Sequence, residues 1–283
     1  MNKNALTPEW RTLSRAALDA AYNNAAAVAG SSDIVAAWEA RSLAFREANV
    51  RHQELRYGVR ERNRIDLFPG KPDRPTLVFF HGGYWQARSK EVFSCFAAGP
   101  LAHGLTVALV GYTLAPDATL DMIVSEAGAA LDHLAARLPA LGVSNPEVII
   151  SGWSAGAHLA AMLCGRPEIQ GALLISGIYD LEPVRHCYVN DKLGLDEAMA
   201  VRNSPILHLP RSGPPVWVAV GGAELSELRR QSSDYAQARQ RAGLSGGFVE
   251  IPGADHFSIL SELESASGRL SRIVSELASA QNR

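Results

Sequence analysis

The chain of 283 residues is 47% hydrophobic and 20% charged, which is typical of a folded globular protein and excludes a disordered or membrane-embedded one. Its 27 basic and 29 acidic side chains give a formal net charge of −2, so no electrostatic field favours a nucleic acid or an anionic membrane as a partner. Because the first ten residues lack the apolar run of a secretory signal, and no stretch reaches about 18 apolar residues, we expect a cytoplasmic protein without a membrane partner.

An N-terminal helical extension is predicted over residues 1–50, because apolar residues recur at helical spacing from residue 8 to about 48, with a break near residues 29–33. Short β-rich runs then follow at residues 52–58, 63–68, 76–80, 106–112, 147–152, 172–177, 216–222 and 247–251. Helical stretches separate most of them, at residues 89–102, 119–140, 155–165, 226–242 and 258–280.

This alternation of strands and helices predicts an α/β fold with a mostly parallel, eight-stranded sheet and helices on both faces. The run TLVFF at 76–80 is apolar throughout, as a strand in a doubly covered sheet requires. The first two strands are joined by the short segment VRERN, so we expect them to form an antiparallel hairpin at the sheet edge. No Pro/Gly/Ser-rich linker divides the chain, which indicates a single domain over residues 1–283.

The segment from 180 to 215 does not fit the alternation. It is rich in polar, aromatic and proline residues and stands where one crossover helix would suffice. An irregular insert of this length is more often functional than idle, so we expect it to form part of a lid.

The strongest chemical signal is GWSAG at 152–156, between a predicted strand and a predicted helix. This is the context of the GxSxG nucleophile elbow, in which the serine sits on a tight, strained turn. Gly152 and Gly156 leave space for the backbone and the helix to approach each other. The sequence therefore predicts Ser154 as a nucleophile, against the alternative of a plain glycine-rich turn.

A second signal is HGGYW at 81–85, directly after the strand TLVFF. Cleavage of an acyl compound builds negative charge on the carbonyl oxygen, which preorganised backbone N–H groups stabilise. We therefore predict an oxyanion hole formed by the amides of Gly82, Gly83 and Ala155. The alternative is a simple turn with a buried aromatic pair.

A general base for Ser154 is predicted at His256, which follows the last strand and can reach the carboxyl end of the sheet. A carboxylate must orient this imidazole, and the candidates are Asp180, Glu224, Glu227 and Asp255. Glu224 is favoured because the order serine, acid, histidine matches that of GxSxG hydrolases. Asp180 stays open as the alternative, with capping of the following turn as its other role. Asp255 is too close to His256 in sequence to fold back easily onto its ring.

Several further motifs carry a family resemblance over most of the chain: AYNN at 21–24, RYG at 56–58 with IDLF at 65–68, YTLAP at 112–116, GWSAGAHLAA from 152, SGIYDLEP at 176–183, GGAELSELRRQS at 221–232 and DHFSIL at 255–260. With HGGYW, they make the chain resemble the arylformamidase (kynurenine formamidase) branch of the α/β-hydrolases, close to carboxylesterases with an HGG motif. The resemblance implies the α/β-hydrolase fold, a triad of Ser154, Glu224 and His256, and an oxyanion loop at Gly82 and Gly83. Its animal members carry Asp where this chain has Glu224.

The residues and the resemblance together predict an enzyme that cleaves small acyl esters or aryl formamides through an acyl-enzyme. An aromatic substrate is favoured by rings close to the motifs, although core packing is an alternative role for each: Tyr84, Trp85, Trp153, Tyr179 and Tyr188. A lipase acting on longer acyl chains and a non-catalytic binding protein are the alternatives.

Neither a cofactor nor a metal ion is expected. The three cysteines lack CxxC spacing, so they indicate neither a disulfide framework nor a thiolate zinc site, and no metal-ligand constellation stands out. A homodimer is left open.

Overall fold

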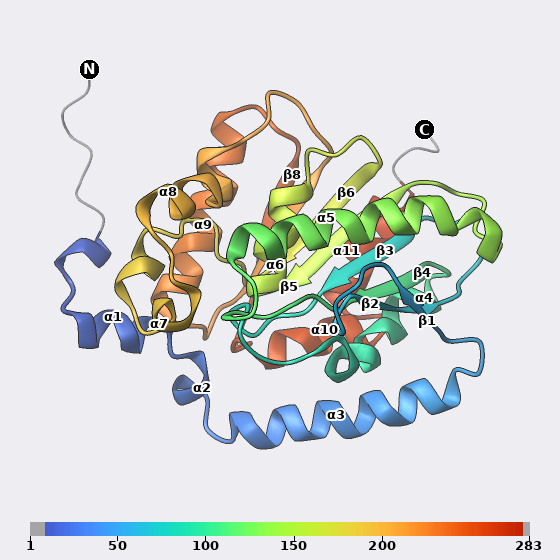
Figure 1. Cartoon of the computed structure of the whole chain (residues 1–283), viewed down its shortest axis with the longest axis horizontal. Helices are drawn as coiled ribbons and strands as arrows, with labels where there is room; N and C mark the ends of the chain where they lie inside the picture. The colour runs from blue at the N-terminus through green and yellow to red at the C-terminus, as the bar shows by residue number, and fades with distance from the viewer. Residues whose placement is uncertain (1–8, 280–283) are drawn as a thin grey trace.

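A twisted sheet of eight strands crosses the centre of the molecule (Figure 1). The computed structural model describes residues 9–279, so residues 1–8 of the predicted extension and residues 280–283 lie outside the described residues. The strand order is β1-β2-β4-β3-β5-β6-β7-β8. The pairs β1–β2 and β2–β4 are antiparallel and the other neighbours are parallel, which confirms the mostly parallel sheet and its edge hairpin. The strands are β1 (Gln53–Arg56), β2 (Arg64–Phe68), β3 (Thr76–Phe80), β4 (Thr106–Val110), β5 (Val148–Trp153), β6 (Ile169–Ile175), β7 (Val216–Gly221) and β8 (Gly246–Ile251).

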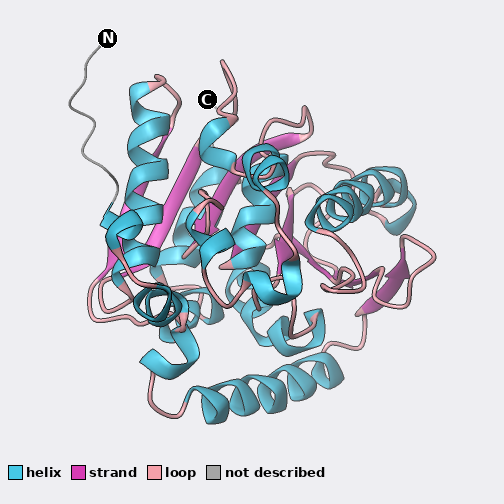
Figure 2. Ribbon diagram, turned by 60° about the vertical axis from the view of Figure 1, so that its left-hand side comes forward, coloured by secondary structure: helices cyan, strands magenta, loops and turns pink. Residues whose placement is uncertain are grey.

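Helices cover both faces of the sheet, as predicted (Figure 2). In β3, Val78 and Phe80 pack into the core on the side of α5 (Leu120–Arg137), α6 (Ala155–Leu163) and α9 (Ser226–Arg241). Leu77 and Phe79 pack into the core on the opposite side, with α3 (Ser31–Ala48), α4 (Ala98–Ala102), α10 (Ser261–Glu264) and α11 (Arg269–Leu277). Successive side chains of a strand point to opposite faces, so an apolar run such as TLVFF is buried at every position.

Two predicted helices differ in detail from the structure. The stretch predicted at 89–102 begins as the 3₁₀ helix η2 (Lys90–Ala97) and continues as α4. The stretch predicted at 258–280 is broken into η6 (Ser258–Leu260), α10 and α11. The second break falls before Gly268, where a side chain would overlap the Glu262 carbonyl. A close backbone approach of this kind is a tertiary contact, which helical periodicity does not reveal.

The N-terminal extension is helical from residue 9, as predicted. It comprises η1 (Glu9–Thr12), α1 (Arg15–Tyr22), α2 (Asn24–Ala27) and α3, which runs along the lower side of the molecule in Figure 1. Trp38 on α3 packs its ring against Trp153 and Phe257, with centroid distances of 5.7 and 5.8 Å. The extension therefore contacts the carboxyl end of β5 and the loop that follows β8.

The segment from 180 to 215 lies between the neighbouring strands β6 and β7 and contains four short helical pieces: η4 (Pro183–His186), α7 (Asn190–Leu193), α8 (Glu197–Arg202) and η5 (Pro205–Leu207). It packs against α1, where Arg15 forms an ion pair with Asp191 at 3.0 Å and the Tyr188 amide donates to Asp19 at 2.6 Å. Its function as a lid stays a prediction. Within residues 9–279, no helix is both long and apolar enough to cross a membrane.

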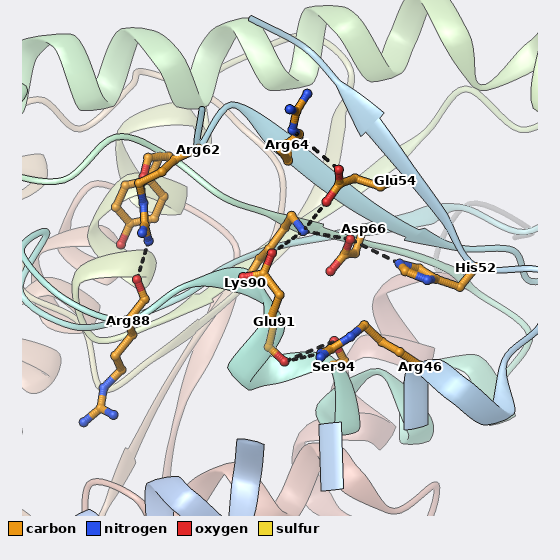
Figure 3. A network of polar contacts seen from close by, with 11 residues as sticks. Arg46, His52, Glu54, Arg62, Arg64, Asp66, Arg88, Lys90, Glu91 and Ser94 are labelled. Atoms are coloured by element: carbon orange, nitrogen blue, oxygen red, sulfur yellow. Dashed lines mark hydrogen bonds and ion pairs between the residues drawn. The ribbon is translucent and has the colours of Figure 1, made fainter. Parts of the chain in front are cut away.

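A buried charge cluster around Lys90 joins η2 to the edge hairpin (Figure 3). Lys90 is only 3% exposed, and its ammonium donates to Asp66 at 2.8 Å, Glu54 at 3.0 Å and Glu91 at 2.5 Å. Asp66 is also buried and lies 3.1 Å from the His52 ring. Buried charges are tolerated only when they are paired, so Lys90 compensates acids from β1, β2 and η2 at once.

We predict that Lys90→Met lowers the free energy of unfolding by about 3–5 kcal/mol, because it leaves the buried Asp66 without its cation. Arg229→Met is the matched control, since Arg229 pairs with Glu250 at 3.1 Å on the surface and such pairs contribute only about 0–1 kcal/mol. Urea unfolding followed by circular dichroism measures both. Equal losses in the two variants would contradict the structural role of the cluster.

Candidate active site

Ser154 occupies a sharp turn between β5 and α6. Its φ of 57° and ψ of −120° are rare for a residue with a side chain, and its amide donates to the Ile175 carbonyl at 2.8 Å. A side chain at Gly156 would overlap the Phe80 carbonyl, and one at Gly152 would overlap the backbone of Gly156. Both glycines of GWSAG thus have the spatial role that the sequence predicts.

The HGGYW loop follows β3 and also departs from ordinary backbone geometry. Gly83, Tyr84 and Trp85 have successive φ values of 119°, 51° and 59°. The Gly83 carbonyl accepts the amides of Gln86 and Ala87, both at 3.0 Å, which closes the turn. A side chain on Gly82 would meet the Trp153 ring at 2.5 Å, so this loop lies directly against the residue before Ser154.

Three amides at this place correspond to the predicted oxyanion hole. Those of Gly82, Gly83 and Ala155 donate to no protein acceptor within the described range 9–279. Gly82 and Ala155 belong to backbone segments that follow the neighbouring parallel strands β3 and β5. Their role in binding an oxyanion stays a prediction.

The start of the loop is held by His81 and Tyr112. Burial lowers the pKa of His81 to about 3, so its ring is neutral near pH 7 and Nδ1–H donates to the Gly82 carbonyl at 2.8 Å. The Tyr112 hydroxyl donates to the His81 carbonyl at 2.8 Å, and the two rings stack at 4.3 Å. These contacts orient the peptide that carries the predicted oxyanion donors.

The far end of the loop is held by Arg62, which sequence reasoning missed. Its guanidinium donates to the Arg88 carbonyl, a contact drawn in Figure 3, and to the Tyr112 carbonyl at 3.0 Å. Arg88 has a φ of 70°, so it belongs to the same strained segment. Nothing in the spacing of Arg62 relative to HGGYW indicates this contact.

His256 and Glu224, predicted from separate loops, form a buried hydrogen-bonded pair. His256 Nδ1 lies 2.7 Å from Glu224 Oε2. The other carboxylate oxygen, Oε1, accepts the Ser176 hydroxyl at 2.6 Å and the Gly221 amide at 2.7 Å. The Trp153 indole N–H donates to the His256 carbonyl at 2.8 Å, which ties the histidine loop to the residue before Ser154.

Ser176 is a second residue that sequence reasoning missed. It follows β6 with a φ of 53° and is completely buried. It begins the motif SGIYDL, but a serine at the end of a strand does not by itself indicate which acid it will bind. The structure shows that its hydroxyl helps to fix Glu224.

The other carboxylates have different partners. Asp180 accepts the Glu182 amide at 3.0 Å, a local turn contact. The 3₁₀ helix η4 that follows has no side-chain cap, so the structure does not show the capping role that the sequence suggested for Asp180. Glu227 pairs with Arg230 at 2.8 Å, and Asp255 accepts the amides of Phe257 and Ser258, both at 2.8 Å. In the part of the chain that the structure describes, Glu224 is the candidate acid that contacts His256.

Ser154 and His256 are almost closed off, with exposures of 2% and 4%. No hydrogen bond joins the serine hydroxyl to the imidazole among the described residues, so proton transfer between them stays a prediction. Such catalytic contacts often tighten only when a substrate is bound.

The aromatic residues proposed for substrate binding differ in their exposure. Trp85, Trp153 and Tyr179 are buried; Trp85 packs edge-on against His158 at 4.9 Å and Tyr179 stacks on Tyr235 at 4.2 Å. Core packing thus accounts for these rings in this structure. Tyr84 and Tyr188 retain exposed surface, and their rings lie 6.4 Å apart. No group of three metal-binding side chains occurs within residues 9–279.

Comparisons with known proteins agree with the mostly parallel sheet and the helices on both of its faces. A family model described as the alpha/beta hydrolase fold matches residues 77–260. The chain belongs to the α/β-hydrolase family.

Among characterised relatives, it is similar to the kynurenine formamidases of Danio rerio, with 37% identity over 74% of this chain and 76% of that protein, and Salmo salar, with 36% identity over 77% and 79%. The crystal structure of a protein from Silicibacter sp. superposes on this chain with a TM-score of 0.83 and 29% sequence identity. The superposition covers 91% of this chain and 98% of that protein's chain. The chain is a hydrolase of this kynurenine formamidase- and esterase-like kind.

We predict that Gly156→Ala lowers the rate of ester hydrolysis by about 100-fold, because the new methyl group must push the elbow away from β3 and a shift of about 1 Å can cost that much. Gly165→Ala, just beyond the same helix, is the matched control, since its side chain would meet nothing within 4 Å. Steady-state rates on 4-nitrophenyl acetate measure the effect. A Gly156→Ala enzyme with the rate of the wild type would contradict the close approach between α6 and β3.

Proposed function

We propose that the chain is a serine hydrolase that cleaves small acyl esters or aryl formamides. In this proposal Ser154 is the nucleophile, His256 the general base and Glu224 the acid that orients it. The observation that carries the proposal is the 2.7 Å hydrogen bond between His256 and Glu224 at the same edge of the sheet as the GWSAG turn.

The proposed reaction has two halves. His256 takes the proton of the Ser154 hydroxyl as its oxygen attacks the carbonyl carbon, and the amides of Gly82, Gly83 and Ala155 stabilise the resulting oxyanion. His256 then gives the proton to the departing aryl oxygen or nitrogen, which leaves an acyl group on Ser154. Water, deprotonated by His256, releases this acyl group as the acid and restores the serine.

Glu224 is suited to its proposed role by its three contacts. A carboxylate fixed by the Ser176 hydroxyl and the Gly221 amide holds its second oxygen in place for His256 Nδ1–H. This keeps the imidazole in the tautomer whose Nε2 can accept the serine proton, and it stabilises the imidazolium that forms. In this proposal the glutamate, whose side chain is one methylene longer, supplies the function that aspartate supplies in related enzymes.

A small acyl group and an aromatic leaving group are the proposed substrate features. Ser154 is only 2% exposed, which supports a small acyl group. The relatives named kynurenine formamidase support a formyl group on an aryl nitrogen. We propose further that the segment 180–215, with Tyr188, covers the leaving group.

Ser154→Ala is expected to lower kcat on the order of 10⁴- to 10⁶-fold without unfolding the protein, because the elbow and the oxyanion amides remain while the nucleophile is lost. His256→Ala should be equally severe, since the two residues act as a unit. Glu224→Gln should cost about 10⁴-fold. Asp180→Asn is the matched control and should stay within tenfold.

These variants are compared by kcat at equal amounts of folded enzyme. Residual activity of Ser154→Ala within tenfold of the wild type would refute the nucleophile. A more damaging Asp180→Asn than Glu224→Gln would move the acid to Asp180.

The substrate class is tested with phenyl acetate, formanilide and 4-nitrophenyl dodecanoate. We expect turnover of the first two and little of the third, because small acyl groups fit the crowded site and an aryl group leaves readily. A preference for the dodecanoate would favour a lipase. Absence of turnover, together with no labelling by a serine-directed organophosphate, would favour a non-catalytic binding protein.

A further inference from the structure

The motif AYNN at 21–24 has no part in the mechanism described so far, yet two of its residues are buried beside the oxyanion loop. Tyr22 and Asn24 have exposures of 0% and 4%, whereas Asn23 between them is partly exposed and caps α2 by accepting the Ala26 amide at 3.1 Å. The two buried side chains therefore need an explanation other than capping.

Both residues bind the hydroxyl of Tyr84. That hydroxyl donates to the Tyr22 carbonyl at 2.5 Å and lies 3.0 Å from the Asn24 side-chain amide. A phenol has a single proton, which is already given to the carbonyl, so the Asn24 atom facing it must be the NH₂ group. The Asn24 amide thus donates to Tyr84, and its oxygen has no partner among the described residues.

Tyr84 lies within the strained part of the oxyanion loop, between Gly83 and Trp85. A non-glycine residue in the left-handed region costs about 1–3 kcal/mol and persists only where its surroundings impose it. For Tyr84, part of this constraint comes from the hydrogen bond with Asn24, which lies 60 residues earlier in the chain.

The segment that holds Tyr84 is itself anchored. The Tyr22 hydroxyl donates to Glu227 at 3.1 Å and accepts from the Gln231 amide at 2.9 Å, both on α9. Gln231 in turn accepts the amides of Tyr179 and Asp180 at 2.7 Å, after β6. The contact with Tyr84 therefore links the oxyanion loop, through Tyr22, to α9 and to the segment after β6.

We propose that Tyr22 and Asn24 position the oxyanion loop: by fixing the Tyr84 hydroxyl they keep the amides of Gly82 and Gly83 aimed at the reacting carbonyl. This inference rests on the proposed function of those amides. An oxyanion forms only on the way through the transition state, so a misplaced loop lowers kcat and leaves KM nearly unchanged.

Asn24→Ala is the main test, with Asn23→Ala as the matched control from the same motif. We expect Asn24→Ala to lower kcat about 10- to 100-fold on phenyl acetate and on formanilide alike, with KM within about threefold. Asn23→Ala should behave like the wild type. Tyr84→Phe, which keeps the ring but removes the bonds to both Tyr22 and Asn24, should cost at least as much as Asn24→Ala. The double variant should lose little more than Tyr84→Phe alone, because the Asn24 amide then has no hydroxyl to bind.

Phenylboronic acid supplies a readout that a general loss of stability would not move. It forms a tetrahedral adduct with a catalytic serine and places an oxygen where the oxyanion would lie. We expect its inhibition constant to rise by the same factor as kcat falls in Asn24→Ala and Tyr84→Phe. Thermal unfolding measured in parallel shows whether each variant is folded.

Normal kcat and boronate inhibition in folded Asn24→Ala and Tyr84→Phe would overturn the proposal. An equal decrease of kcat in Asn23→Ala would also overturn it. The same holds for an increase in KM with an unchanged kcat. A loss confined to formanilide would also overturn it, and would instead indicate that the Asn24 oxygen binds the substrate N–H, which an ester lacks. If the wild type itself turned over neither substrate, the proposed function would fail, which is a result distinct from each of these.

Discussion

The close approach between α6 and β3 is the constraint on which the rest of the site depends. The Phe80 carbonyl occupies the space that a side chain at Gly156 would need. The backbone of Gly156 in turn occupies the space that a side chain at Gly152 would need. This contact sets Ser154 on its strained turn and brings the loop after β3 against Trp153. Because β3 and β5 are neighbours in the sheet, backbone packing alone places the proposed nucleophile and the proposed oxyanion donors side by side.

The residues with strained backbone geometry lie at this edge of the sheet. Hydrogen bonds from other parts of the chain keep them in these conformations. Within residues 9–279 the non-glycine residues with positive φ are Tyr84, Trp85, Arg88, Ser154 and Ser176. Each conformation costs about 1–3 kcal/mol, and side chains from elsewhere in the chain offset it, as Asn24 does for Tyr84 and Arg62 for Arg88. The amides proposed as oxyanion donors are thus held in place without a substrate, which is the condition for electrostatic stabilisation of a transition state.

Segments far apart in the sequence contact one another beside the HGGYW loop. The N-terminal helix α1 packs on the insert at Asp191 and Tyr188, and the insert reaches the loop where the Gln86 side chain donates to the Val189 carbonyl at 2.6 Å. On the other side, the Lys90 cluster fixes η2, which begins just after the loop. Ser154 itself is only 2% exposed, which agrees with the small acyl groups proposed for the substrate.

The sequence by itself determined the eight strands, most of the helices between them, and the GWSAG and HGGYW turns, because periodicity and strand-turn-helix context are local properties. It favoured Glu224 as the acid but left Asp180 open, since both follow strands of the sheet. Only the tertiary structure brought Glu224 to 2.7 Å from His256, whereas Asp180 makes a local turn contact with the Glu182 amide instead. It alone also revealed the bond from Asn24 to Tyr84, because a contact across 60 residues depends on how the whole chain packs.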